Sequence, residues 1–309
     1  MTTDGNPRET DAAIAVEGLT VRYGKTPALD SVTLRVEPGS VYALLGRNGA
    51  GKTSLIRCLL GHRKPEAGRT RCFGLDCWRD RVRILSRMAV VPEEPDAPRE
   101  MTARKLGGFF ASLYPGWDEK AFRDHVSRFA IPTELAFKRL SKGQKTQLNL
   151  TLAIASRPEI LVLDDPTLGL DAVARRAILE EIVGELADRE TTVLITSHDL
   201  AGIEGIAQRV GILKEGKLIL DESLESVKDR FRKVILTGGE RPGVEKSLES
   251  LRPLKVASRP WGTEGWVQGF SEGVFENLRK NPAGAGAEAS PMSLEEVFIA
   301  LVGEEGGAL

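Results

Sequence analysis

The chain has 309 residues, with 43 Lys and Arg against 44 Asp and Glu, so its formal net charge is -1. This balance excludes a whole-chain electrostatic attraction to nucleic acid or to anionic lipid, and we expect no nucleic-acid partner. The three cysteines, Cys58, Cys72 and Cys77, do not have the spacing of a zinc site. No apolar run approaches the roughly 18 to 20 residues that cross a bilayer.

The N-terminal half predicts a tail, an antiparallel layer and the start of a buried sheet. Residues 1–12 are polar and acidic where a signal peptide needs an apolar stretch, and we predict a disordered tail. Short alternating apolar segments broken by turn residues over 13–36 favour antiparallel strands. The apolar run Val41–Leu45 then precedes a glycine loop and an amphipathic stretch from Lys52 to Leu60, which is the pattern of buried strand, loop and helix.

The middle of the chain predicts a largely parallel core sheet. Buried runs at 160–163 and 192–195 flank a long helical pattern, which is βαβ order. A segment at about 95–155 is predicted to be an inserted helical subdomain. We predict an α/β domain over 13–231 and a small α+β domain over 232–309.

A glycine-rich loop carries the strongest chemical signal. Residues 46–53 fit the pattern G-x-x-x-x-G-K-[ST] between the expected strand and helix, the context that confirms a phosphate loop. Backbone N–H groups of such a loop surround phosphate oxygens, the lysine reaches the β- and γ-phosphates, and the threonine hydroxyl binds Mg²⁺. The sequence therefore predicts Mg²⁺-ATP bound by Gly46, Arg47, Asn48, Gly49, Ala50, Gly51, Lys52, Thr53 and Ser54.

Two acidic residues end the second buried strand. Because open α/β sheets bind ligands at the carboxyl ends of their strands, we predict Asp164 as a Mg²⁺ ligand. Asp165 follows it and is predicted to orient and deprotonate the attacking water.

Two further features are undecided from the residues alone. His198 follows the last buried strand, and a lone histidine is more often a structural hydrogen-bonding group than a catalytic one. Ser141 is a good N-cap of the helical run that follows it, which makes either a second anion site or an ordinary capped helix.

The phosphate loop, the segment that begins at Ser141, the strand that ends in Asp164 and His198 occur in this order along the chain. Together they resemble the ATPase subunit of an ATP-binding cassette (ABC) transporter over about residues 14–222. The resemblance implies the ABC type of P-loop NTPase fold, with an antiparallel β layer beside the core sheet. It implies that Tyr23 stacks on adenine and that His198 senses the γ-phosphate. It also implies a signature that contacts ATP on the opposite subunit, formed by Ser141, Lys142, Gly143 and Gln144, and a dimer loop containing Leu170 and Asp171.

Three positions depart from the family pattern. Lys142 replaces the usual signature glycine, a variant associated with ABC-2-type exporters. Glu93 stands where the family has a glutamine that binds Mg²⁺, and a carboxylate can serve the same cation. Asp165 replaces the usual catalytic glutamate and is one methylene shorter, so we predict slow hydrolysis.

The resemblance implies an enzyme that hydrolyses ATP to drive transport, with a separate multi-pass permease as its partner. A homodimer is expected, and a heterodimer with a related cassette stays open. The expected location is cytoplasmic, on the inner face of the membrane, with Glu93 and Phe109-Phe110 near the docking surface. The alternatives are a soluble cassette ATPase that acts on DNA or ribosomes, and a module that uses ATP only as a clamp. The transported substrate stays open.

Overall fold

The computed structural model describes residues 12–237, 248–280 and 284–303. The chain divides into two compact units, Met1–Asp221 and Glu222–Leu309, and each is described by itself. Apart from residue 12, the predicted tail lies outside the described residues. The domain boundary predicted after residue 231 stays a prediction.

The first unit is built on a six-stranded sheet with strand order β10-β9-β3-β8-β7-β6. Its parallel strands β3, β7 and β8 are almost wholly buried, as their continuous apolar runs predict. Residue 164 at the end of β7 pairs with Thr196 at the end of β8, so these carboxyl ends meet at one edge. The strands are β3 (Val41–Gly46), β6 (Met88–Val91), β7 (Ile160–Asp164), β8 (Thr192–Thr196), β9 (Arg209–Lys214) and β10 (Lys217–Ser223).

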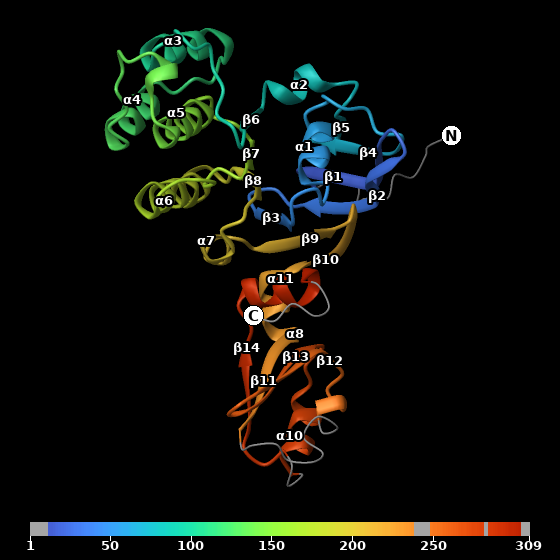
Figure 1. Cartoon of the computed structure of the whole chain (residues 1–309). Helices are drawn as coiled ribbons and strands as arrows, with labels where there is room; N and C mark the ends of the chain where they lie inside the picture. Colours follow the sequence, from blue (N-terminus) through green and yellow to red (C-terminus); the bar gives the residue numbers. More distant parts are fainter. Residues whose placement is uncertain (1–11, 238–247, 281–283, 304–309) are drawn as a thin grey trace. The chain divides into compact units, whose positions relative to one another are not determined.

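A second, antiparallel sheet in this unit has strand order β2-β1-β4-β5. Apolar side chains of this sheet, of helix α1 and of β3 form one buried cluster, so α1 packs within the core that the two sheets share (Figure 1). The elements are β1 (Ile14–Tyr23), β2 (Thr26–Val36), α1 (Lys52–Leu59), β4 (Ala67–Cys72), β5 (Leu75–Asp76) and α2 (Arg81–Leu85).

A helical subdomain with its own apolar core joins this unit beyond β6 (Figure 1). Its aromatic residues pack in sequence: Phe110 stacks on Tyr114, and Trp117 contacts both Phe110 and Phe122. The helices are α3 (Ala103–Leu113), α4 (Glu119–Arg128), η1 (Phe137–Arg139) and α5 (Lys142–Ala155). The chain then returns to the sheet, where α6 (Ala172–Arg189) and α7 (Leu200–Glu204) follow β7 and β8.

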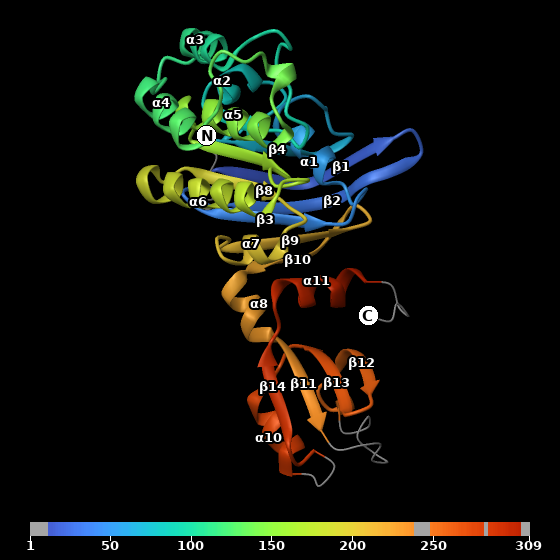
Figure 2. The same ribbon diagram turned by 60° about the vertical axis from the view of Figure 1, so that its left-hand side comes forward.

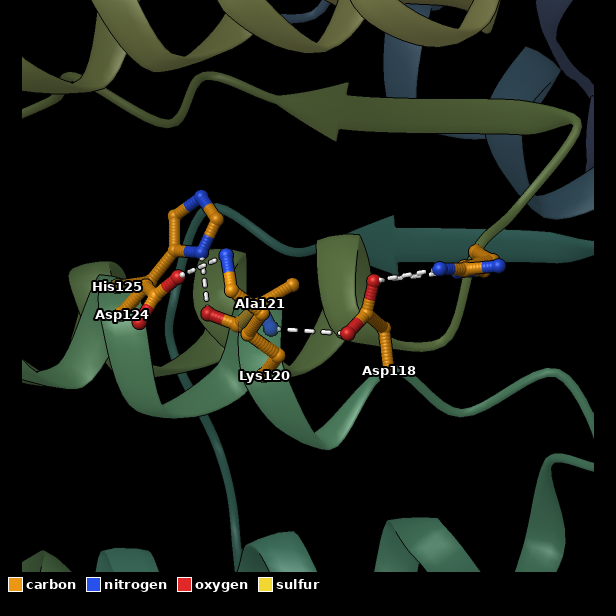
Figure 3. Close-up of polar contacts among 6 residues, drawn as sticks. Asp118, Lys120, Ala121, Asp124 and His125 are labelled. Carbon is orange, nitrogen blue, oxygen red and sulfur yellow. Dashed lines mark hydrogen bonds and ion pairs between the residues drawn. The ribbon is translucent and has the colours of Figure 1, made fainter.

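Polar contacts fix α4 in place, and Figure 3 shows those among Asp118, Lys120, Ala121, Asp124 and His125. Asp118 caps the helix by accepting a hydrogen bond from the Ala121 N–H at 2.9 Å, and its carboxylate also pairs with Arg157 at 2.7 Å. The ring of His125 contacts the Ala121 carbonyl at 2.5 Å and the buried carboxylate of Glu181 on α6. Helix α4 is thereby tied both to the end of α5 and to α6.

The second unit is a small α+β fold around a four-stranded antiparallel sheet with order β12-β13-β11-β14 (Figure 2). One face buries apolar residues of β11 and β13 against Phe275 and Leu278 of helix α10. Its elements are α8 (Leu224–Arg230), β11 (Phe231–Thr237), β12 (Pro253–Arg259), β13 (Gly262–Gln268), α10 (Glu272–Lys280), β14 (Ala287–Pro291) and α11 (Leu294–Val302).

The architecture confirms the predicted fold class. A mostly parallel core sheet, an antiparallel β layer, a helical insert and an α+β appendage are all present. Among the described helices, none combines the length and the apolar character that a membrane crossing requires.

Candidate nucleotide site

One cavity of about 430 Å³ lies at the carboxyl ends of β3, β7 and β8, a volume within the range of small-molecule sites. It brings together most of the residues that the sequence singled out for nucleotide chemistry. Its lining consists of Tyr23, Ala28, Asn48, Gly49, Ala50, Gly51, Lys52, Thr53, Ser54, Glu93, Asp164, Asp165, Thr196 and His198.

The phosphate loop takes its shape from two glycines with positive φ. Gly49 has φ +81° and Gly51 has φ +113°, which is backbone that L-residues with side chains rarely adopt. A Cβ on Gly51 would also lie 2.4 Å from the Ala28 carbonyl oxygen. The loop thus packs directly against the β1–β2 layer at Gly51, and α1 starts at the next residue with its N-terminal N–H groups available to an anion.

Lys52 is buried beneath this loop. Its ammonium donates hydrogen bonds to the Gly46 carbonyl at 2.5 Å and to the Arg47 carbonyl at 3.3 Å. Burial lowers the pKa of Lys52, and the charges of Asp165 and Asp164 offset part of that effect. A buried ammonium beside carboxylates is suited to bind the terminal phosphates of a nucleotide.

The predicted metal ligands Thr53, Asp164 and Glu93 all line this cavity. The Asp164 carboxylate accepts a hydrogen bond from the Thr196 hydroxyl at 2.7 Å, which fixes its orientation. The described residues contain no cluster of three or more His, Cys, Asp or Glu that could enclose a metal alone. This oxygen-only set fits Mg²⁺, which proteins hold through one or two carboxylates together with substrate phosphates and water.

Asp165 is held at its backbone, and its side chain is almost wholly buried. Its φ is +48°, its backbone N–H donates to both the carbonyl and the hydroxyl of Thr196 at 3.0 Å, and it is 4% exposed. One carboxylate oxygen, Oδ2, lies 3.2 Å from Nε2 of His198, while Oδ1 is buried without a hydrogen-bond partner. Burial raises the pKa of Asp165, and the charge of His198 opposes that shift. A buried carboxylate oxygen without a hydrogen-bond partner is costly, and a catalytic role is one reason that a protein retains such a group.

Tyr23 is the aromatic residue of this cavity. The residue is 43% exposed at the end of β1, and its hydroxyl is directed to α1. Hydrogen bonds from Ser54 and then Arg57 lower the pKa of Tyr23. An exposed ring at the rim of a phosphate-binding cavity can stack on a base.

The predicted signature and dimer loop do not line the cavity. Ser141 caps α5 in a reciprocal capping box: its hydroxyl accepts from the Gln144 N–H at 3.2 Å, and its own N–H donates to the Gln144 side chain at 3.0 Å. The two elements lie against each other instead, because a Cβ on Gly143 would be 3.7 Å from Leu170 and one on Gly169 would be 3.0 Å from the ammonium of Lys142. Asp171 accepts a hydrogen bond from the Ala174 N–H and so caps α6.

The residues that line the nucleotide cavity differ in part from those that the sequence predicts. Gly46 and Arg47 do not line the cavity; their carbonyls hold Lys52 instead. Thr196 and Ala28 line it without having been predicted. The sequence contained a signal for Thr196, because this polar residue ends the strand that pairs with β7 at Asp164. Ala28 had none, since its place depends on how the two sheets pack.

Comparison with known proteins gives consistent matches. A family model described as "ABC transporter" matches residues 29–168. The chain is 32% identical to "ABC transporter ATP-binding protein YtrB" of Bacillus subtilis (strain 168), over 67% of this chain and 70% of that protein. It is 34% identical to "Nod factor export ATP-binding protein I" of Paraburkholderia xenovorans (strain LB400), over 96% of this chain and 98% of that protein. A solved "Structure of ATP binding subunit of ABC transporter" matches with a TM-score of 0.65 and 26% identity, over 70% of this chain and 92% of that one.

Proposed function

The chain belongs to the ABC transporter ATP-binding proteins and is an ATP-hydrolysing subunit of that family, and on this premise we propose how its own residues perform the reaction. The observation that carries the proposal is the single cavity that joins the phosphate loop, the carboxylates after β7 and His198.

The phosphate loop and Lys52 hold the triphosphate of ATP, and Tyr23 stacks on its adenine. Asp165 orients the attacking water and accepts its proton, and Oδ1 is the carboxylate oxygen that no other protein group holds. His198 contacts Oδ2 of the same carboxylate and keeps it in position. Asp165 is shorter than the glutamate usual in the family, so a less favourable distance to water supports slow turnover.

Thr53, Asp164 and Glu93 are the side chains that would hold Mg²⁺, which supplies neutralisation of phosphate charge when bound. The Thr196 hydroxyl keeps the Asp164 carboxylate oriented toward this task. Bound Mg²⁺ would take its remaining ligands from the substrate's own phosphates and from water.

Two cassettes close around two ATP molecules. Residues 141–144 of one subunit contact the γ-phosphate held by the other, and Leu170 and Asp171 lie in the loop that links the two sites. The proximity of the two segments within one chain supports this, since a Cβ built on Gly143 would lie 3.7 Å from the Leu170 side chain. A homodimer is the simplest form, and recovery of a second, related cassette in the purification below would instead indicate a heterodimer.

The dimer drives a separate multi-pass permease from the cytoplasmic face of the membrane, in the export direction. Export is supported by the near full-length match to a Nod factor export ATP-binding protein. The helical subdomain supplies the docking surface, where Phe109 is 50% and Leu113 is 56% exposed on α3.

The test is affinity purification of the tagged Asp165→Asn protein with Mg²⁺-ATP from detergent-solubilised membranes of the native host. A stoichiometric multi-pass protein that is lost in a Lys52→Ala control is the expected result. An ATP-dependent dimer without a membrane protein would overturn the transport assignment and favour a soluble cassette ATPase. Phosphate release from the wild-type chain separates an enzyme from a module that uses ATP only as a clamp.

A further inference from the structure

Arg63, which does not line the nucleotide cavity, lies against the ring of Tyr23. The guanidinium carbon of Arg63 is 4.9 Å from the Tyr23 ring centroid, which is cation–π distance. Tyr23 lines the cavity and Arg63 does not, so the cation contacts the ring from outside the nucleotide space. No motif in the sequence singled out Arg63.

The same arginine also secures the backbone beside Tyr23. Its Nη2 donates to the Arg22 carbonyl at 2.6 Å and to the Glu66 carboxylate at 2.6 Å, while the other oxygen of Glu66 accepts from the Arg22 N–H at 3.0 Å. Both backbone polar groups of Arg22 are therefore satisfied by the Arg63–Glu66 pair.

The strand arrangement explains why this pair is needed. Strand β4 pairs with β1 only as far as Ala67, opposite Thr20, so β1 extends beyond its partner. Beyond that point the N–H and the carbonyl of Arg22 face the side of β1 that β4 leaves open, and the Arg63–Glu66 pair meets both groups there. The Arg63–Glu66 pair thus supplies the hydrogen-bond partners that a longer β4 would give to Arg22, the residue before the aromatic ring.

We propose that Arg63 is a positioning residue for base recognition: with Glu66 it holds Tyr23 in the orientation that stacks on the adenine of ATP. Ser54 and Arg57 fix the hydroxyl of Tyr23 from α1, and Arg63 fixes the ring and the preceding peptide. The ring is then ordered before the nucleotide arrives, so binding loses less side-chain entropy. This inference rests on the proposed adenine contact of Tyr23.

The experiment measures equilibrium dissociation constants of the full chain for ATP and for inorganic tripolyphosphate, which has no base. Arg63→Ala is expected to weaken ATP binding about three- to tenfold, because it removes a cation–π contact and the preordering of one aromatic side chain. Tripolyphosphate binding is expected to stay within about twofold, since the phosphate loop is untouched. Arg63→Lys, which retains the charge but not the fork, is expected to recover part of the loss.

The chain offers a matched control. Arg87 lies over the Phe73 ring at 3.8 Å and pairs with Glu159 at 2.5 Å, so Arg87→Ala removes the same chemistry away from the cavity. It is expected to leave both dissociation constants unchanged.

A double-mutant cycle separates this inference from the proposed function. In a Tyr23→Ala background, Arg63→Ala is expected to have no further effect on ATP binding. If Tyr23→Ala does not weaken ATP binding, the adenine contact itself is wrong. If Tyr23→Ala weakens it but Arg63→Ala does not, or if Arg63→Ala weakens tripolyphosphate equally, the positioning role is overturned.

Discussion

Asp165 and His198 are in direct contact: Oδ2 of the buried carboxylate lies 3.2 Å from Nε2 of the imidazole. The contact joins a residue after β7 to one after β8, and the backbone of Asp165 is anchored on Thr196 of the same neighbouring strand. The carboxylate therefore has one oxygen held and one, Oδ1, without a partner. Because His198 holds Oδ2 and no protein group holds Oδ1, the Asp165 carboxylate is suited to orient water rather than only to bind metal.

Replacing Asp165 by Asn retains the shape of the side chain but removes the base. We expect phosphate release to fall on the order of 100-fold or more, a typical contribution of a general base. The dissociation constant for ATP is expected to change less than about threefold, because Lys52 and the loop are intact. Steady-state turnover and equilibrium binding on the same preparation check this, and unchanged turnover would remove Asp165 from the mechanism.

The two positive-φ glycines of the phosphate loop differ in one respect, and that difference is testable. A Cβ at Gly49 meets nothing within 4 Å, whereas a Cβ at Gly51 would lie 2.4 Å from the Ala28 carbonyl oxygen. We expect Gly49→Ala to lower the free energy of unfolding by about 1 to 2 kcal/mol through backbone strain alone. Gly51→Ala adds overpacking of about 1 to 3 kcal/mol. Urea unfolding measures both, and equal losses would contradict the packing of the loop on Ala28.

Tyr42 gives a prediction for alkaline stability. Its buried hydroxyl donates to the Asp221 carboxylate at 3.0 Å, and burial, with the charge of Asp221, raises the pKa of Tyr42 well above 10. Because the folded pKa exceeds the unfolded one, the hydrogen bond contributes fully below pH 10 and is lost as pH rises toward the folded value.

Tyr42→Phe is expected to cost about 1.5 to 3 kcal/mol at pH 8, the range for a hydrogen bond to a charged group. The difference in unfolding free energy between the two proteins is expected to shrink above pH 10. A gap that stays constant to pH 11.5 would show that Tyr42 does not titrate differently in the two states.

The docking surface is best tested at Phe109 rather than at Phe110. Phe110 stacks on Tyr114 and contacts Trp117, so a charge there disturbs the subdomain itself. Phe109 is half exposed, and Phe109→Glu is expected to abolish co-purification of the permease and leave ATP affinity within about twofold. Lys120→Glu on α4, whose side chain is 84% exposed, is the control for added charge. Retention of the permease by Phe109→Glu would place docking elsewhere.

The sequence by itself determined the phosphate loop, the strand that ends in Asp164, and the fold class. These features are local: apolar periodicity, glycines at fixed offsets and polar residues at strand ends each depend on a short segment. The family resemblance added roles for Tyr23, His198 and residues 141–144, which stay predictions.

Only the tertiary structure decided which distant residues share the cavity. Three contacts join segments that are far apart in the chain: Asp165 with His198, the phosphate loop with Ala28, and Arg63 with Tyr23. No local pattern encodes such contacts, because they depend on how two sheets and a helix pack. The sequence did not indicate a role for Arg63 for that reason. Its partners are the end of a strand and an aromatic ring about 40 residues away, and only folding brings them together.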